Sequence, residues 1–168
     1  EAERIVADLQ GKSFIVEDIR KGERTKKPPI PFTTSTLQQE ASKVLNFSTQ
    51  KTMRLAQQLY EGVDVQGRGT IGLITYLRTD STRIADEADA MAREYINSNY
   101  GEKYVLQNEQ ARKSSAKIQD AHEAIRPTDI TLTPAMAKES LSRDQFRLYQ
   151  LIWRRFTASR MQPAIYET

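Results

Sequence analysis

The strongest constraint on the fold is a helical spacing of apolar residues in two neighbouring segments that each begin with hydroxyl side chains. The segments cover about residues 35–45 and 48–60, and a short Asn-Phe-Ser turn separates them. Ser and Thr cap helices by accepting a hydrogen bond from a free backbone N–H of the first turn. The pattern therefore predicts two short helices in a helix-turn-helix-like pair. The predicted inward faces hold Leu37, Ala41, Val44 and Leu45 in the first helix, and Met53, Ala56, Leu59 and Tyr60 in the second.

A third segment, near the C-terminal end, has the clearest helical period in the chain. Thr133 and Pro134 suit the start of a helical region, and Pro163 is expected to end it. Arg143, Arg147 and Arg154 share one face, because offsets of 4 and 11 residues return to nearly the same angle. These arginines are candidates for contacts with an anion. A separate apolar stripe consists of Phe146, Tyr149, Ile152, Trp153 and Phe156.

The connections between these helices predict further elements. Four glycines indicate a loop or hairpin at 61–72, which leads into the apolar, β-favouring run 73–77. A helix is expected from about Ser81 to Asn99, and a short helix at 118–126 is expected to end at Pro127. The inward face of the first of these helices is predicted to hold Ile84, Ala88, Met91 and Tyr95.

The two ends of the chain have a different pattern. The first residues resemble the end of a helix, residues 12–20 alternate as in a strand, and residues 164–168 suggest another partial strand. A lone strand is not stable in water, so the protein is expected to begin upstream of this sequence. The basic, proline-rich stretch at 20–31 has the composition of a linker. The predicted fold class is mainly α, with short strands only at the two ends.

Composition narrows the classes of function. Without cysteine there can be no disulfide scaffold, Cys-ligated zinc or thiol nucleophile, and a single histidine argues against a transition-metal cage. No apolar run reaches the roughly 20 residues that a membrane span needs, and no signal peptide is evident, so a cytoplasmic protein is expected. The net charge is only +3, but basic residues cluster at 20–27 and 143–160. Such clusters suit a polyanionic partner, although a charged run also forms an ordinary solvated face.

Tyr76 stands where the apolar run changes abruptly to Arg, Thr, Asp, Ser and Thr. In extended backbone, residues two apart point to the same side, so Tyr76, Arg78 and Asp80 are expected to converge. A protonated phenol is a weak nucleophile, and attack on phosphorus needs a cation to stabilise the developing charge. Arg78 fits that role, with Asp80 holding its guanidinium. Taken alone, Tyr76 also fits a half-buried strand aromatic, and His122 a helix-surface residue.

Two segments resemble the hallmark motifs of one enzyme family. The sequence ITYLRTDST contains Tyr76, and AHEAIRPTD contains His122, 46 residues further on. PFTTSTLQQEA and LYQLIWRRF are similar to the same family in the same order, so the matches span about 28–162. The family is the type IA DNA topoisomerases. Leu77 after the tyrosine and the sequence HEAIRPT favour bacterial topoisomerase I over topoisomerase III or reverse gyrase.

This resemblance implies a CAP-like, helix-turn-helix-like active-site tyrosine domain at 28–162, joined at 1–27 and 163–168 to the family's β-rich arch. It implies that Tyr76 attacks single-stranded DNA to give a 5′-phosphotyrosyl link, which allows strand passage and relaxation of negative supercoils without ATP. Arg78 matches the arginine at the scissile phosphate, and His122 the histidine that positions the DNA backbone. Asp80, Glu123 and Arg126 are implied supporting residues, and Arg143, Arg147 and Arg154 remain the DNA-binding candidates.

The family's Mg²⁺ is bound by a Toprim domain, whose acidic DxDxE cluster is absent from this sequence. The resemblance thus implies that this chain contains no metal ligand and that the isolated chain is inactive. It also implies two partners. The partners are single-stranded DNA and the remaining domains of the same polypeptide, at the bacterial nucleoid.

Two other functions are compatible with the residues alone. The chain could be a non-catalytic helix-turn-helix module in which Gln50, Lys51, Arg54 and Gln57 contact DNA bases. It could also be a protein-interaction domain that uses the aromatic helix around Trp153. Binding that survives high salt would favour the second of these, because phosphate contacts weaken steeply with salt.

Overall fold

The computed structural model describes residues 1–107 and 122–168 of the chain. The chain divides into two compact units, one made of residues 1–26 and 165–168 and the other of residues 27–164. All the residues predicted to form the functional site belong to the larger unit.

The smaller unit contains α1 (Ala2–Leu9), β1 (Glu23–Lys26) and all of β4 (Ala164–Glu167) except its first residue, and β1 pairs with β4. Gly22 and Thr168 exchange two backbone hydrogen bonds, of 2.8 and 3.0 Å. The partial strand expected at 164–168 is therefore confirmed. The strand expected at 12–20 is wrong, because this stretch pairs with nothing described and the paired residues lie further along the chain, at β1.

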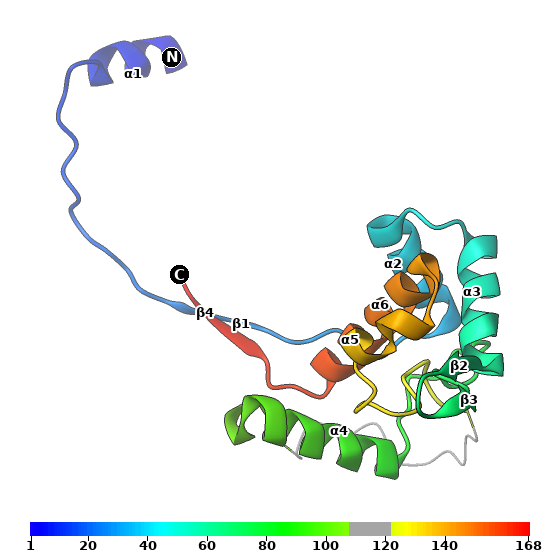
Figure 1. The fold of residues 1–168 in the computed structure, drawn as a ribbon. Coiled ribbons are helices and arrows are strands. Elements are labelled where there is room, and N and C mark those ends of the chain that lie inside the picture. Colours follow the sequence, from blue (N-terminus) through cyan, green and yellow to red (C-terminus); the bar gives the residue numbers. More distant parts are fainter. Residues whose placement is uncertain (108–121) are drawn as a thin grey trace. The chain divides into compact units, whose positions relative to one another are not determined.

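The larger unit is mainly helical, as predicted (Figure 1). Helices α2, α3 and α6 pack against one another, and α5 contacts α6. The elements are α2 (Thr34–Leu45), α3 (Thr49–Glu61), β2 (Val63–Val65), β3 (Gly69–Ile71), α4 (Asp86–Tyr100), α5 (Pro134–Ala137) and α6 (Arg143–Ser159), with 3₁₀ turns η1 (Glu102–Tyr104) and η3 (Lys138–Ser140).

Hydroxyl caps begin four of these helices. Thr33 and Thr36 exchange capping bonds at the start of α2, and Ser142 and Gln145 do the same at α6. Ser48 caps α3, and Thr133 caps α5. Each cap satisfies an N–H that has no partner inside the helix, so the starts predicted near residues 35, 48 and 133 are confirmed to within a residue or two by α2, α3 and α5. The sequence predicted no separate start for α6, which begins at Arg143.

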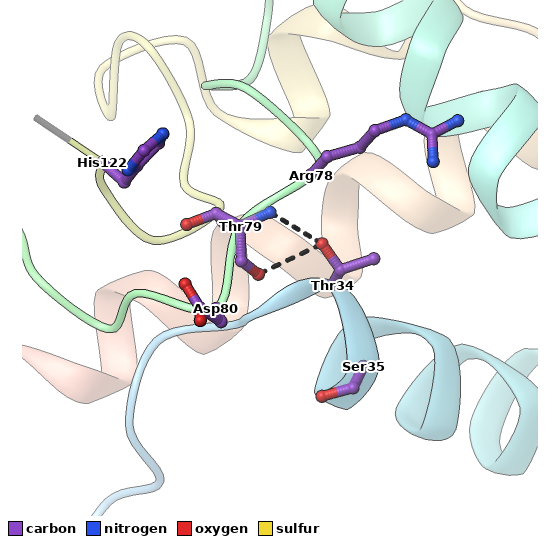
Figure 2. Close-up of a pocket in the computed structure, with 6 residues that line it drawn as sticks. All are labelled: Thr34, Ser35, Arg78, Thr79, Asp80 and His122. Carbon is purple, nitrogen blue, oxygen red and sulfur yellow. Dashed lines mark hydrogen bonds between the residues drawn. The ribbon is translucent and has the colours of Figure 1, made fainter.

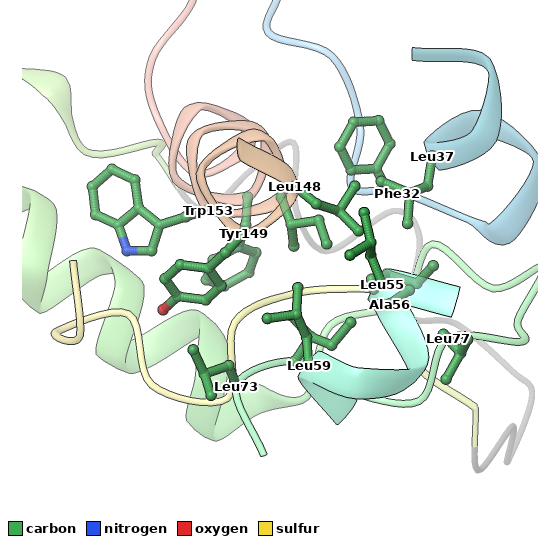
Figure 3. Packing of buried hydrophobic residues seen from close by; sticks show 14 of the residues in the cluster. Phe32, Leu37, Leu55, Ala56, Leu59, Leu73, Leu77, Leu148, Tyr149 and Trp153 are labelled. Atoms are coloured by element: carbon green, nitrogen blue, oxygen red, sulfur yellow. The ribbon is translucent and has the colours of Figure 1, made fainter. Parts of the chain in front are cut away.

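The hydrophobic core is formed by α6 together with α2, α3 and the segments that carry the predicted site (Figure 3). Tyr149 and Trp153 of α6 are buried and use their polar atoms to donate hydrogen bonds to the carbonyl oxygens of Leu132, at 2.6 Å, and Ile130, at 2.9 Å. Leu73, Ile74 and Leu77 are fully buried in the same cluster. The core therefore anchors the backbone on both sides of Tyr76.

Residues 61–72, predicted as a loop or hairpin, form the antiparallel hairpin β2–β3. The prediction that strands occur only at the two ends of the chain is therefore wrong. The turn of the hairpin contains Gly67 and Gly69 at φ of 78° and 74°, a left-handed conformation that glycine adopts without strain. Arg68 at the tip forms a 2.6 Å ion pair with Asp129.

Helix α4 begins at Asp86, later than the Ser81 start predicted from the sequence. The Ser81 N–H is bound by the Thr79 hydroxyl and the Arg83 N–H by the Ser81 hydroxyl, so local side chains compete with the helix for these donors. Ala88, Ala92 and Ile96 form the buried face. Met91, predicted to be inward, is exposed.

The short helix expected at 118–126 is wrong over its described part, residues 122–126. These residues run past other segments, and the N–H of Ile125 donates to the carbonyl oxygen of Phe32 at 2.8 Å. The N–H of Ala124 donates to Arg83 at the same distance. Residues 118–121 lie outside the described part of the chain. No helix in the described residues is long and apolar enough to cross a membrane.

Candidate active site

Tyr76 lies on an irregular, bent segment whose buried and exposed residues alternate around it. Leu77 and Thr79 point into the protein, whereas Tyr76, Arg78 and Asp80 are exposed. Tyr76 is 48% exposed to solvent, and its hydroxyl makes no hydrogen bond with a described residue. The phenol is thus held on a fixed backbone but is accessible to a partner molecule.

Thr75 joins the Tyr76 segment to the segment that carries His122. Its hydroxyl donates to the carbonyl oxygen of Ala124 at 2.7 Å and accepts from the N–H of Arg126 at 3.0 Å. Its own N–H donates to the carbonyl oxygen of Arg126 at 2.9 Å. One threonine therefore fixes the position of the tyrosine segment relative to the histidine segment.

Thr34, the first residue of α2, fixes the other side of the tyrosine segment. Its hydroxyl donates to the carbonyl oxygen of Leu77 at 2.7 Å and accepts from the N–H of Thr79 at 2.9 Å. The Thr34 N–H also donates to the carbonyl oxygen of Thr79 at 2.9 Å. Arg78 lies between the two residues that Thr34 binds, so its backbone is held while its side chain reaches outward.

Two adjoining grooves meet at this segment. The first, which we call the tyrosine groove, has a volume of about 260 Å³. The second, the arginine groove, measures about 430 Å³ (Figure 2). Thr79 and His122 line both, so the two grooves share a wall. The tyrosine groove is lined by Tyr60, Thr75, Tyr76, Thr79, His122 and Glu123, and the arginine groove by Thr34, Ser35, Arg78, Thr79, Asp80 and His122.

The predicted pairing of Arg78 with Asp80 is wrong. The two side chains extend away from each other in Figure 2, and neither forms an ion pair or hydrogen bond with any described residue. The bends in this segment break the extended geometry on which the expected convergence of Tyr76, Arg78 and Asp80 depended. Arg78 therefore keeps its five N–H donors available for an anion.

Glu123 and Arg126 stabilise the histidine segment. The Nε of Arg126 donates to Glu123 at 2.7 Å in a half-buried ion pair, and its Nη1 donates to the carbonyl oxygen of Pro127 at 3.0 Å. Sequence reasoning missed Arg83, whose Nε donates to the carbonyl oxygen of His122 at 3.3 Å. Its distance of 39 residues from His122 gave no signal for this contact.

Sequence reasoning also assigned Tyr60 to the wrong face of its helix. Tyr60 was expected to point inward, but 40% of its side chain is exposed and it lines the tyrosine groove. The buried face of α3 consists of Thr52, Leu55, Ala56 and Leu59. The aromatic ring of Tyr60 contacts that of Tyr76, with centroids 5.4 Å apart.

The three arginines predicted on one face of α6 differ in their surroundings. Arg143 and Arg154 are exposed and form no ion pair or hydrogen bond with a described residue. Arg147 is partly covered, lies 3.9 Å from Asp144, and donates to the carbonyl oxygen of Leu45 at 3.4 Å. Only Arg143 and Arg154 are thus fully available to an anion.

Several residues that the two alternative functions require are already in contact with neighbouring residues or are buried. Lys51 forms a 2.6 Å ion pair with Asp144, which holds the pKa of that carboxyl below its usual value. Lys51 also lies over the ring of Phe47. Gln57 donates to Glu61, and Trp153 is buried in the core. These contacts disfavour base recognition by α3 and partner binding through Trp153.

A metal site would require a cluster of ligating side chains. Among residues 1–107 and 122–168, no three His, Cys, Asp or Glu side chains gather in a way that could hold an ion. The two grooves contain a phenol, a guanidinium, an imidazole and hydroxyls, and their two carboxylates, Asp80 and Glu123, line different grooves.

These features agree with the comparisons with known proteins. A family model described as DNA topoisomerase matches residues 1–168, the whole chain. The structure of full-length topoisomerase I from Thermotoga maritima is similar to 99% of this chain, with 46% sequence identity and a TM-score of 0.82. The chain spans 26% of the length of that protein. The resemblance to bacterial topoisomerases inferred from the Tyr76 and His122 motifs is thus confirmed, and the chain belongs to the DNA topoisomerase family.

Proposed function

We propose that this chain carries the nucleophile of a type IA DNA topoisomerase and that the nucleophile is Tyr76. The observation that carries the proposal is the arrangement of the two grooves. An exposed phenol lies in one groove, an unpaired guanidinium lies in the other, and His122 lines both. A phosphodiester in these grooves would meet a nucleophile and a cation together.

In the proposed step, the Tyr76 hydroxyl oxygen attacks the phosphorus of a single-stranded DNA phosphodiester. A bond from this oxygen to phosphorus forms as the bond from phosphorus to the 3′ oxygen breaks. The phenol loses its proton, and the leaving oxygen takes up a proton to become a 3′-hydroxyl. One phosphodiester replaces another, so the reverse reaction reseals the strand without ATP. Passage of the other strand through the break relaxes negative supercoils.

Arg78 would supply charge stabilisation at the phosphoryl oxygens. Its guanidinium presents donors in a planar fork that matches two oxygens at once. His122, on the shared wall of the grooves, would position the DNA backbone. Glu123 and Arg126 would act by holding the histidine segment through their ion pair. Asp80 would contribute to the arginine groove rather than to the orientation of Arg78.

The proposal assigns Mg²⁺ to the family's Toprim domain, outside this chain. The described residues contain no group of three His, Cys, Asp or Glu side chains that could hold the ion. We infer that residues 28–162 form the active-site tyrosine domain and that residues 1–27 and 163–168 belong to the β-rich arch. Under this proposal the partners are single-stranded DNA and the other domains, at the bacterial nucleoid. The isolated chain is expected to be inactive.

The central test is covalent attachment to DNA. The chain is mixed with a separately produced Toprim metal domain, Mg²⁺ and a single-stranded oligonucleotide labelled at its 3′ end. A 5′-phosphotyrosyl link would leave the label on the protein, which denaturing gel electrophoresis detects. Wild-type chain is expected to become labelled, whereas Tyr76→Phe should bind the oligonucleotide normally and form no adduct.

Tyr104→Phe is the matched control, because Tyr104 is also exposed but lies outside both grooves. This variant should become labelled at the wild-type rate. Formation of an adduct by Tyr76→Phe would refute the assignment of the nucleophile.

A further inference from the structure

We propose that Tyr60 is a positioning residue for Tyr76, holding the phenol of the nucleophile in the tyrosine groove by a ring-to-ring contact. The ring centroids lie 5.4 Å apart with an angle of 65° between their planes. This edge-to-face geometry is a favoured arrangement of aromatic pairs. Both rings line the tyrosine groove with His122. This inference rests on the proposed role of Tyr76 as the nucleophile. It gives a role to Tyr60, which has none in the proposed function.

The backbone brings the two tyrosines together by an unusually close approach. The N–H of Leu73 donates to the carbonyl oxygen of Leu59 at 2.7 Å, which joins the end of α3 to the start of the tyrosine segment. Gly72 passes so near that a Cβ at this position would lie 2.6 Å from the carbonyl oxygen of Tyr60. Only glycine fits there without displacing backbone. The contact between the rings is thus built into the chain path.

The contact has a physical consequence for an exposed nucleophile. With about half of its surface open and no hydrogen bond from its hydroxyl to a described residue, Tyr76 would otherwise sample several rotamers. Attack on phosphorus needs the oxygen in line with the bond that breaks, and each unproductive rotamer lowers the fraction of molecules ready to react. The Tyr60 ring restricts this freedom while Tyr76 stays about half exposed in the lining of the groove.

The ring, and not the hydroxyl, of Tyr60 is responsible in this proposal. The Tyr60 hydroxyl makes no hydrogen bond with a described residue. Two other roles would have different signatures. If Tyr60 stacked on a DNA base, its loss would weaken DNA binding, and if its hydroxyl took part in proton transfer, Tyr60→Phe would be impaired.

The experiment compares Tyr60→Leu and Tyr60→Phe with a matched control, Tyr100→Leu. Tyr100 forms a similar edge-to-face pair with Tyr95, at 6.4 Å and 67°, outside the two grooves. Attachment rates are measured at saturating DNA in the reconstituted mixture, and DNA affinity is measured separately. Tyr60→Leu should slow attachment by about 2- to 10-fold, the range expected from the strength of such pairs. Its DNA affinity should change by less than about twofold, and Tyr60→Phe and Tyr100→Leu should match the wild type.

A second measurement tests the contact without relying on catalysis. In NMR spectra of the chain with labelled tyrosines, the Tyr76 ring signals are assigned by their loss in Tyr76→Phe. Wild-type spectra should show magnetisation transfer between the two rings, and Tyr60→Leu, but not Tyr60→Phe, should shift the Tyr76 signals and increase ring mobility. If attachment failed even in the wild type, the proposed function would fall while this measurement still decided the contact.

Three results would overturn the proposal. The first is an absence of ring-to-ring transfer in the wild-type spectra. The second is a loss of DNA affinity in Tyr60→Leu as large as its loss of rate, which would indicate base stacking. The third is an equal defect in Tyr60→Phe, which would indicate a role for the hydroxyl.

Discussion

Single hydroxyl groups fix the geometry of the candidate site. The hydroxyl groups of Thr75 and Thr34 each donate one hydrogen bond and accept another. Thr75, next to Tyr76 in the chain, binds the backbone of Ala124 and Arg126, and Thr34 binds the backbone of Leu77 and Thr79. Threonine suits this task because one oxygen can both donate and accept, and because its branched Cβ restricts the side chain to few rotamers. The residues that surround the nucleophile are therefore as much a part of the site as the charged groups.

The Thr75 contacts predict the effect of Thr75→Val, which keeps the shape of the side chain and removes its hydroxyl. The carbonyl oxygen of Ala124 and the N–H of Arg126 would each lose a partner in a partly buried position. Leaving such groups unsatisfied costs about 1–3 kcal/mol. Urea unfolding should show this loss, whereas Thr82→Val should be close to neutral, because Thr82 is exposed and bonds to no described residue. Equal stability of the two variants would show that the Thr75 contacts contribute nothing.

At the scale of elements, capped and amphipathic helices could be predicted from the sequence, whereas segments held by distant partners could not. Helices α2, α3 and α6 have caps and apolar stripes within their own residues. Residues 122–126 have helical local composition, but their N–H groups bind Phe32, Arg83 and Thr75, which lie far away in the sequence. Residues 12–20 alternate like a strand and have no strand beside them. In both cases the structure depends on whether a distant segment lies alongside to form hydrogen bonds, which the local sequence pattern does not show.

The same distinction applies to the candidate site. An apolar run that ends in polar residues is a local signal, and the sequence therefore placed Tyr76 and Arg78 at the end of a buried run, where the structure shows both exposed. The Arg78–Asp80 pair was wrong because bends cannot be inferred from spacing. Tyr60 was assigned inward because an aromatic residue next to a buried Leu59 extends the apolar stripe, but the structure leaves it 40% exposed, with its ring against that of Tyr76, 16 residues further on.

A partly buried charge cluster joins α4 to the end of α6. Asp89 accepts hydrogen bonds from Arg93 at 2.6 Å and from Arg160 at 2.9 Å. Arg93 also donates to the carbonyl oxygen of Leu106. Burial raises the pKa of Asp89, but the bonds from Arg93 and Arg160 together outweigh this effect, so that the pKa lies below its usual value of 3.8. Asp89 therefore stabilises the fold above the pKa of the unfolded chain, and this contribution is lost as the pH falls through the lower pKa of the folded chain.

The sign of this shift predicts how Asp89→Asn behaves with pH. At pH 7 the variant should be less stable by about 1–3 kcal/mol, because two partly buried guanidinium groups lose their charged partner. The deficit should shrink as the pH falls from about 5 towards 2, where the wild-type carboxyl becomes neutral as well. Urea unfolding at several pH values measures the difference.

Asp64→Asn is the control for this prediction, because Asp64 is exposed and its carboxyl forms no ion pair or hydrogen bond with a described residue. It should show little deficit at any pH. A deficit in Asp89→Asn that stays constant from pH 7 to pH 2 would contradict the role given to the charge.

At the scale of the whole molecule, the positions of the unpaired basic side chains are more informative than the net charge. The net charge is only +3, yet one face of α6 carries two arginines that are unpaired among the described residues. Other basic groups are neutralised by neighbours, as Lys51 is by Asp144 and Arg68 is by Asp129. The cations that remain unpaired, Arg78, Arg143 and Arg154 among them, are those that a phosphate backbone can use.

Salt dependence of binding tests this distribution. When a protein cation contacts a phosphate, it releases a counterion from the DNA, so the affinity falls as the salt concentration rises. For single strands, each contact increases the magnitude of this slope, log affinity against log salt concentration, by about 0.7. Arg143→Gln and Arg154→Gln should therefore each reduce the magnitude of the slope by about 0.7. Arg147→Gln should lower it less, because Arg147 already lies near Asp144 and binds the carbonyl oxygen of Leu45. Fluorescence anisotropy with a labelled oligonucleotide at several salt concentrations gives each slope. If the wild-type slope were flat, or if Arg147→Gln alone reduced it, the face of α6 would not be the DNA contact that its unpaired arginines predict.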